Sequence, residues 1–234
     1  MYSILKYYRE LLDNIRVLEE KMVGNLPENN SVILIGKVND TPIFSHEVFG
    51  EGFYTFNLSV LRLSDTYDVI PILISDRLLE PSKIQFGVPL KIEGQFRSYN
   101  SKESNDHKLL LSVFAREVEV LETIEDSRNP NSIELNGFIC KKPVFRTTPS
   151  GREISDILLA VNRSYNKSDY LPCISWGRNA RYTQSLKVGD NIKVWGRIQS
   201  RTYQKHLENG EVQNRVAYEI SVAKLALVES EDIH

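Results

Sequence analysis

The sequence predicts an all-β protein made of two similar small barrels in tandem, preceded by a short helix. Three observations lead to this prediction: the chain repeats itself at an offset of 101 residues, each copy contains short strand-like runs, and only the first 28 residues carry a clear helical period. A length of 234 residues allows one large domain or two small ones. With 41% hydrophobic and 26% charged residues, the chain can bury an ordinary globular core.

The helical pattern occupies residues 1–28. Apolar side chains recur at steps of three and four residues from Ile4 to Met22, and Gly24 and Pro27 end the pattern. We therefore expect a short N-terminal amphipathic α-helix. Its apolar stripe either packs on the barrels of its own chain or pairs with another subunit or a partner, and the pattern leaves both open.

The internal repeat is clear at residues 30–44 and 131–145, where six of fifteen positions are identical without gaps. The offset of 101 then pairs Arg62 with Arg163, and one extra residue makes it 102 for Gly94 and Gly196. A register that persists this far indicates a duplication. We divide the chain into a leader helix (1–28), repeat A (30–122), a polar linker (123–130), repeat B (131–229) and a short acidic tail (230–234).

Each repeat has the pattern of a small barrel. Repeat B contains five strand-like runs, at residues 133–139, 154–161, 171–176, 191–199 and 216–222. Between the third and the fourth, residues 179–186 can form a short helix that Gly189 ends. Five strands with one small helix are typical of the oligonucleotide-binding (OB) fold, so we predict two tandem five-stranded OB-fold barrels. An open sandwich remains an alternative, because periodicity does not show closure.

Charge is divided unevenly between the repeats. The whole chain has a net charge of −2, but repeat B has 15 Lys and Arg against 9 Asp and Glu, a net of +6. Repeat A has 9 against 13, a net of −4. A near-neutral total therefore hides one basic barrel beside one acidic barrel.

Aromatic residues follow the same division, since both tryptophans lie in repeat B among tyrosines and cations. Trp195 alternates with apolar residues and shares its strand face with Lys193 and Arg197, so we expect it to face outward. Flat rings stack on unpaired bases while cations follow the phosphates, a combination that predicts binding of single-stranded nucleic acid. Rings also occur in strands for packing alone, and Trp176 could point inward.

Repeat B also resembles the bacterial single-stranded DNA-binding proteins. The segment LKVGDNIKVWGRIQSRTY, residues 186–203, is similar to the family almost throughout, and Asn131, Gly137, Trp176 and Tyr218 follow its order. The resemblance implies stacking positions at Tyr165, Tyr170, Trp176 and Tyr203. The equivalent places in repeat A are Ser64, Val69, Ser75 and either Ser101 or Tyr99, which are mostly not aromatic. We therefore expect repeat B to bind and repeat A to have mostly lost the means.

The candidate interface combines these rings with the cations around them: Tyr165, Tyr170, Trp176, Trp195, Tyr203, Arg163, Lys167, Arg178, Lys193, Arg197, Arg201 and Lys205.

The resemblance implies non-catalytic, largely sequence-independent binding of single-stranded DNA in replication, recombination and repair. RNA is compatible with stacking, because the face of a base does not report its sugar. It also implies a homo-oligomer, here a dimer of chains with four barrels, and contacts with replication proteins. The paired barrels, the helical leader and the lack of a long acidic-tipped tail depart from the family and suggest a specialised or mobile-element relative.

A second hypothesis is a structural or adaptor protein of a replication or primosome complex that acts through the leader and acidic repeat A. A sugar- or peptide-binding barrel is a third, because such barrels host many ligands. No enzyme, cofactor or metal is expected: the four histidines lie in loops or at the end, the two cysteines lie within strand patterns, and no phosphate-binding loop occurs. With no long apolar run and no secretory signal, we expect a cytoplasmic protein that does not enter a membrane.

Overall fold

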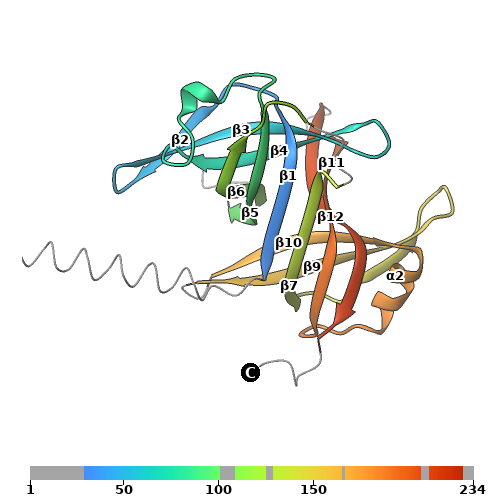
Figure 1. The fold of residues 1–234 in the computed structure, drawn as a ribbon. Helices are drawn as coiled ribbons and strands as arrows, with labels where there is room; N and C mark the ends of the chain where they lie inside the picture. Colours follow the sequence, from blue (N-terminus) through green and yellow to red (C-terminus); the bar gives the residue numbers. More distant parts are fainter. Residues whose placement is uncertain (1–28, 101–108, 125–128, 165–166, 207–210, 229–234) are drawn as a thin grey trace, which may run out of the picture.

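The computed structural model describes residues 29–100, 109–124, 129–164, 167–206 and 211–228 (Figure 1). The predicted leader helix and acidic tail lie outside these residues, as does the middle of the predicted linker. No helix in the described part of the chain is long and apolar enough to cross a membrane.

The two repeats have the same order of strands. Repeat A contains β1 (Asn30–Val38), β2 (Ile43–Val48), β3 (Glu51–Leu61), β4 (Tyr67–Ser75), the 3-10 turn η1 (Pro81–Lys83), β5 (Pro89–Asn100) and β6 (Leu109–Val120). Repeat B contains β7 (Asn131–Ile139), β8 (Val144–Thr147), β9 (Glu153–Arg163), β10 (Lys167–Trp176), α2 (Gly177–Tyr182), the 3-10 turn η2 (Thr183–Ser185), β11 (Asn191–His206) and β12 (Val212–Leu227).

Each repeat closes into a barrel of five strands, which confirms the predicted OB-fold pair and removes the open sandwich. In repeat A the ring runs β1, β3, β4, β6, β5 and returns to β1, with β4 and β6 parallel. In repeat B it runs β7, β9, β10, β12, β11 and returns to β7. The short strands β2 and β8 lie outside these rings as extensions of the β3 and β9 edges.

Alternation along the strands forms the two cores. On β7, Ile133, Leu135 and Ile139 are buried between half-buried or exposed neighbours, and β1 shows the same pattern with Val32, Leu34 and Val38. Side chains of period two point to opposite faces of a strand, so one face of each strand fills the barrel. The other face stays available for contacts outside the barrel.

Each barrel has one glycine at a close approach of two backbones, and the two glycines occupy equivalent positions. A Cβ on Gly94 would lie 2.2 Å from the carbonyl oxygen of Phe114, and one on Gly196 would lie 2.2 Å from that of Ser221. The register of each hairpin shifts beside these glycines. Only glycine allows such a close backbone approach, which explains why both copies carry it at the same position.

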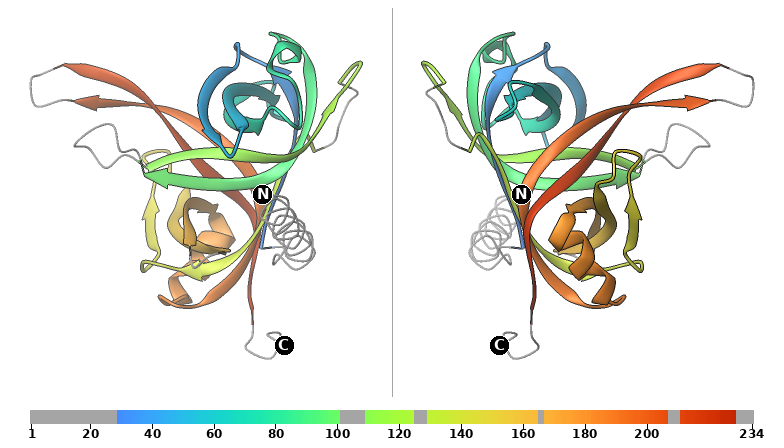
Figure 2. Two further views of the ribbon diagram at one scale, coloured as in Figure 1. Left: turned by 90° about the vertical axis from the view of Figure 1, so that its left-hand side faces the viewer. Right: turned by 90° about the vertical axis from the view of Figure 1, so that its right-hand side faces the viewer.

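The two barrels share one sheet. β1 pairs antiparallel with β7, Val32 facing Ile133, so the strands β6, β5, β1, β7, β11 and β12 follow one another without a break (Figure 1). Figure 2 shows the long hairpin of β11 and β12, in orange and red, running from barrel B past barrel A. We call this hairpin the B arm. It brings residues of repeat B against the outer surface of repeat A.

Candidate nucleic-acid interface

Two rings of the predicted interface lie on one face of β10. Tyr170 and Trp176 point outward, with 48% and 36% of their surfaces exposed, while Leu171 and Cys173 point into the barrel. Six residues of strand separate the rings by about 20 Å, at ~3.3 Å per residue. Half-buried Pro172 lies between them. We call this surface, marked by Tyr170, Pro172 and Trp176, the β10 face.

The neighbouring strand β9 has only small or aliphatic side chains opposite Tyr170 and Pro172. Tyr170 faces Ala160 on β9, and Pro172 faces Leu158. Small and aliphatic neighbours let a flat ligand approach the phenol without displacing a large side chain. Trp176 ends the strand at the point where α2 begins, which places it beside the exposed Arg178.

Tyr203 belongs to a separate part of the surface, the B arm. Its ring is 37% exposed and lies opposite Arg215 on β12. The guanidinium carbon of Arg201 lies 5.9 Å from the centre of the ring, close enough for a cation–π contact. Tyr203 thus has a cation on its own strand and another on the strand opposite. Tyr165 lies outside the described residues, and the side chain of Lys205 is not among those described.

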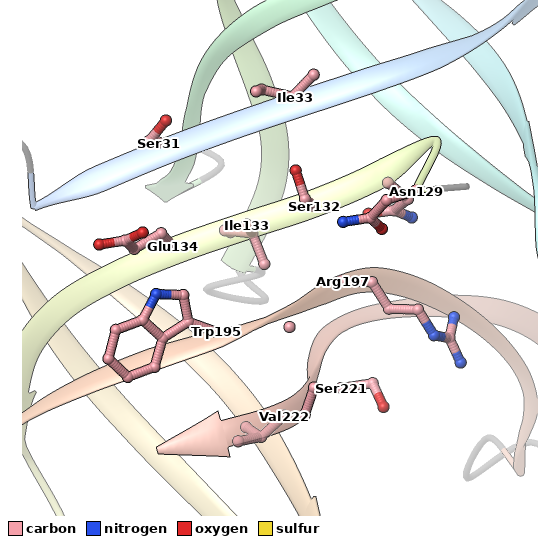
Figure 3. A pocket seen from close by; sticks show the side chains of 13 residues that line it. Ser31, Ile33, Asn129, Ser132, Ile133, Glu134, Trp195, Arg197, Ser221 and Val222 are labelled. Carbon is pink, nitrogen blue, oxygen red and sulfur yellow. The ribbon is translucent and has the colours of Figure 1, made fainter. Parts of the chain in front are cut away.

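Trp195 lies elsewhere, on the sheet that joins the two repeats. Its strand β11 is separated from β10 by β12, so the indole does not belong to the β10 face. The amino groups of Lys193 and Lys224 lie 5.3 Å and 4.6 Å from the ring centre. Figure 3 shows the indole beside Glu134, at the edge of a hollow of about 420 Å³ that also includes Ser31 and Ile33 of repeat A. Trp195 faces outward as expected, but on a different side of the barrel.

Three of the predicted phosphate-contacting cations already pair with carboxylates. Lys193 pairs with Glu134, and its hydrogen bond lowers the pKa of that carboxyl. Arg163 lies 3.3 Å from Asp169, and Arg197 lies 3.1 Å from Asp68. These two arginines therefore belong to contacts within the protein.

Other cations of the predicted set are freer. Lys167 and Arg178 are exposed, and no ion pair with another described residue involves them. Arg201 approaches Glu219 only to 4.0 Å. Among the cations of the set whose side chains are described, Lys167, Arg178 and Arg201 remain open to a ligand.

Two buried aspartates connect the repeats, and the sequence reading missed both. Asp68 on β4 accepts the backbone N–H of Ser200 at 2.6 Å as well as bonds from Arg62 and Arg197. Asp169 on β10 accepts the backbone N–H of Ser98 at 2.7 Å.

The pair was visible in the sequence as an arginine followed six residues later by an aspartate, in both copies. Burial raises the pKa of the Asp169 carboxyl, against the opposing effects of the Ser98 bond and Arg163. The same burial makes each aspartate costly to leave unpaired, so both positions anchor one repeat to the other.

Repeat A carries rings that the comparison by position did not find. Its positions Ser64, Val69 and Ser75 are not aromatic, as the sequence states. The neighbouring strands supply rings instead: His46 stacks on Phe53 with centres 4.9 Å apart, and Phe53 lies 6.1 Å from Phe114. The signal available was the aromatic-rich run FSHEVFGEGFYTF, residues 44–56.

Groups for other chemistry are few in the described part of the chain. No cluster of three His, Cys, Asp or Glu there could hold a metal ion. Cys173 is buried, which raises the pKa of its thiol strongly, and half-buried Cys140 shows a rise with the same cause.

Comparison with known proteins follows the same division between the repeats. A family model described as the single-strand binding protein family matches residues 130–228, which is repeat B. Single-stranded DNA-binding protein A of Bacillus subtilis is 31% identical over 106 residues, 42% of this chain and 59% of the relative. Single-stranded DNA-binding protein B of the same organism is 35% identical over 81 residues, 32% of this chain and 72% of the relative.

The chain spans about half the length of most curated relatives that it matches, such as 48% of single-stranded DNA-binding protein 1 of Staphylococcus aureus. Among solved structures, the wild-type single-stranded DNA binding protein from Thermus aquaticus superposes with a TM-score of 0.68 at 20% identity. The match covers 86% of this chain and 93% of that one, so the likeness of fold extends over both repeats.

Proposed function

This chain belongs to the single-strand binding protein family, and we propose that it binds single-stranded DNA without catalysis, mainly through the β10 face of repeat B. The observation that carries the proposal is the pair of outward rings on one strand, Tyr170 and Trp176. Stacking on a ring accepts any base, so binding is largely independent of sequence.

The proposed path of the DNA strand joins the exposed rings and the open cations. Trp176 and Arg178 mark one end of the β10 face and Tyr170 and Lys167 the other. Tyr203 with Arg201 supplies a further contact on the separate B arm. Lys167, Arg178 and Arg201 contact phosphates, whereas Arg163 and Arg197 act mainly inside the protein. Tyr165 and Lys205 stay in the proposed set on the strength of the sequence.

The wider role proposed here is protection of unpaired DNA in replication, recombination and repair. Two barrels in one chain make a dimer of chains, with four barrels, the expected assembly. Other replication proteins are the expected partners. Light scattering of the full chain with and without oligo-dT tests the assembly, and oligo-U in place of oligo-dT tests whether RNA is accepted.

The sharpest test of the β10 face removes its two rings. Y170A/W176A should weaken binding of a fluorescent oligo-dT by about 2–6 kcal/mol, at ~1–3 kcal/mol per stacked base. Anisotropy titration measures the loss. If the variant has the same melting temperature and the same affinity as the wild type, the β10 face is not the binding surface.

Two single-tryptophan variants serve as matched controls. W195F keeps only Trp176, and its fluorescence should fall strongly when oligo-dT is added. W176F keeps only Trp195, at the seam between the repeats, and its fluorescence should change little. The reverse order would move the proposed site from the β10 face to the shared sheet.

A further inference from the structure

The strand β1 is apolar on both of its faces. The run from Val32 to Ile35 contains only aliphatic residues, although inward and outward positions alternate along it. Val32 and Leu34 fill barrel A, while Ile33 and Ile35 are half-buried on the outer side of the shared sheet. Strands that are covered on both faces have such continuous apolar runs. The pattern of β1 therefore indicates a cover on its outer side.

The duplication provides a matched comparison for these positions. At the offset of 101, Ile33 corresponds to Glu134 on the outer side of β7. Ile35 corresponds in the same way to Asn136. The two strands are neighbours in the shared sheet. The outer side of this sheet is thus apolar in the repeat that follows the leader and polar in the other repeat.

A hollow continues the apolar surface from β1 toward repeat B. Its volume is about 420 Å³, and Ile33 borders it on one side (Figure 3). Trp195, Gly196 and Val222 border it on the other side. The indole of Trp195 is half-buried. We call the surface formed by Ile33, Ile35 and Trp195 the outer sheet face; both repeats contribute to it.

The leader has the length and the pattern of a segment that would cover the outer sheet face. Its apolar residues, from Ile4 to Met22, recur on one side of a predicted helix of ~28 Å, at ~1.5 Å per residue. The six strands from β6 to β12 in the shared sheet are about 24 Å wide, at ~4.8 Å between neighbours. A helix of this length therefore spans the sheet.

The described chain begins beside the outer sheet face. The backbone oxygen of Asn29 accepts the N–H of Asn136 at 2.8 Å, and the side chain of Asn29 donates to the carbonyl oxygen of Asn162 at 2.7 Å. Two residues later, Ser31 lines the hollow. The segment 23–28 spans at most ~20 Å when extended, at ~3.3 Å per residue. The leader is thus attached within reach of the outer sheet face.

Charges beside the outer sheet face complement charges of the leader. Glu117 and Glu119 of β6 are exposed and form no ion pair with another described residue. The register places them two strands from Ile33, on the same side of the sheet. In the leader, Arg9 and Arg16 border the apolar stripe and lie seven residues apart, on the same side of a helix. The arginines can therefore pair with the two glutamates while the stripe covers the isoleucines.

We propose that the leader helix, residues 4–22, packs its apolar stripe on the outer sheet face of its own chain. A second copy of the chain would also bury this face. The leader fits better, because the outward isoleucines occur only in the repeat that is joined to it. A leader in this position contacts β1 and β11 together, so it connects the two repeats. The inference does not depend on DNA binding.

Trp195 reports on this contact. It is the only tryptophan in a W176F background, and L12E/I15E places two charges in the middle of the stripe. The emission of Trp195 in the full chain should then shift to longer wavelength, and acrylamide should quench it more strongly, because the indole meets water. S3E/V17E adds the same charges away from the stripe and should change neither measurement. Thermal melting shows whether the barrels of both variants are folded.

Photocrosslinking identifies the surface that the leader contacts. The full chain with p-benzoylphenylalanine in place of Tyr8, within the stripe, should crosslink to peptides of β1 or β11. The product should run as a single chain on a denaturing gel. The same group in place of Val17, away from the stripe, should give little of it. I33E/I35N, which gives β1 the outer residues of β7, should lower the yield from position 8 severalfold.

Three results would overturn the proposal. A crosslinked product of two chains would show that the leader packs on a second copy. An emission of Trp195 that shifts to longer wavelength on dilution would show that a second copy covers the outer sheet face. An emission that L12E/I15E leaves unchanged would show that the leader does not cover Trp195. None of these results requires oligo-dT, so the inference can fail while the proposed function stands.

Discussion

Repeats A and B have the same backbone fold but differ in the residues on the outer side of the central strand. Both keep the glycine that lets two backbones touch, Gly94 and Gly196, and both keep a buried aspartate, Asp68 and Asp169. On the outer side of the central strand, repeat B has Tyr170 and Trp176 where repeat A has Val69 and Ser75. Packing constrains the glycines and the buried aspartates but not the residues on the outer face. After a duplication, the copies can therefore diverge on the outer face.

Each repeat also contacts the central strand of the other. Ser98 of β5 contacts β10 of repeat B, and the B arm contacts β4 of repeat A. Each copy therefore helps to shape the outer surface of the other. The shape of the outer surface of one repeat therefore depends partly on residues of the other repeat.

The largest expected effect separates the two aspartate anchors. Each aspartate accepts a backbone N–H, but Asp68 also meets two arginines, whereas Asp169 meets one arginine at 3.3 Å and its Oδ2 has no partner among the described residues. D68A should lower the free energy of unfolding by about 3 kcal/mol, the low end of ~3–5 for a broken buried pair, because both guanidinium groups are partly exposed. D169A should cost about 1–2 kcal/mol.

Urea unfolding of the two variants and the wild type measures this difference. Equal losses would mean that the anchors are equivalent and that the second arginine contributes nothing. A loss at D169A larger than at D68A would reverse the comparison.

The sequence predicted the parts of this molecule that depend on local period. The five barrel strands of each repeat follow from alternation and turn residues, whereas closure does not, because periodicity leaves an open sandwich possible. The resemblance implied the outward rings at Tyr170 and Trp176, and alternation alone left Trp176 free to point inward. The pairing of β1 with β7 followed from neither, because the half of β1 that does not pair with β3 can pair with another repeat without leaving a local pattern.

Other features escaped for different physical reasons. Trp195 alternates like an outward residue, which specifies a face of the strand but not which neighbours surround it. The row from His46 to Phe114 draws on three strands, so no comparison of single positions reveals it. Aspartate is usually a surface residue, and the burial of Asp68 is explained only by its arginine and serine partners.

The second prediction concerns a pair of arginines at the same place in the two copies. Arg178 and Arg77 are 101 residues apart, but Arg77 pairs with Glu51 at 3.3 Å while Arg178 pairs with no described residue. K167A/R178A should reduce the slope of log affinity against log salt by about 1.4, at ~0.7 per phosphate on a single strand. R77A should leave it unchanged.

Anisotropy titrations with oligo-dT over a range of salt concentrations give the slopes. A slope that R77A also reduces, by the ~0.7 expected for one phosphate, would show that the acidic repeat contacts phosphates as the basic one does. Such a result would mean that the repeats do not differ in their phosphate contacts, although they would still differ in their exposed rings.

The smallest expected effect is a dependence of stability on pH that comes from Asp169 in repeat B. Burial raises the pKa of the Asp169 carboxyl, so the folded protein holds this proton more tightly than the unfolded chain does. The resulting stabilisation is complete below the ordinary aspartate pKa of about 3.9 and disappears as the pH rises through the raised value.

D169N keeps an oxygen for the Ser98 N–H but cannot titrate. The wild type should therefore lose stability relative to D169N across that window, with a slope of at most about 1.4 kcal/mol per pH unit for one proton. Urea unfolding at several pH values measures the difference between the two proteins. A difference that grows in favour of the wild type with rising pH would show that the ion pair with Arg163 outweighs burial, and that both anchors work as charged pairs.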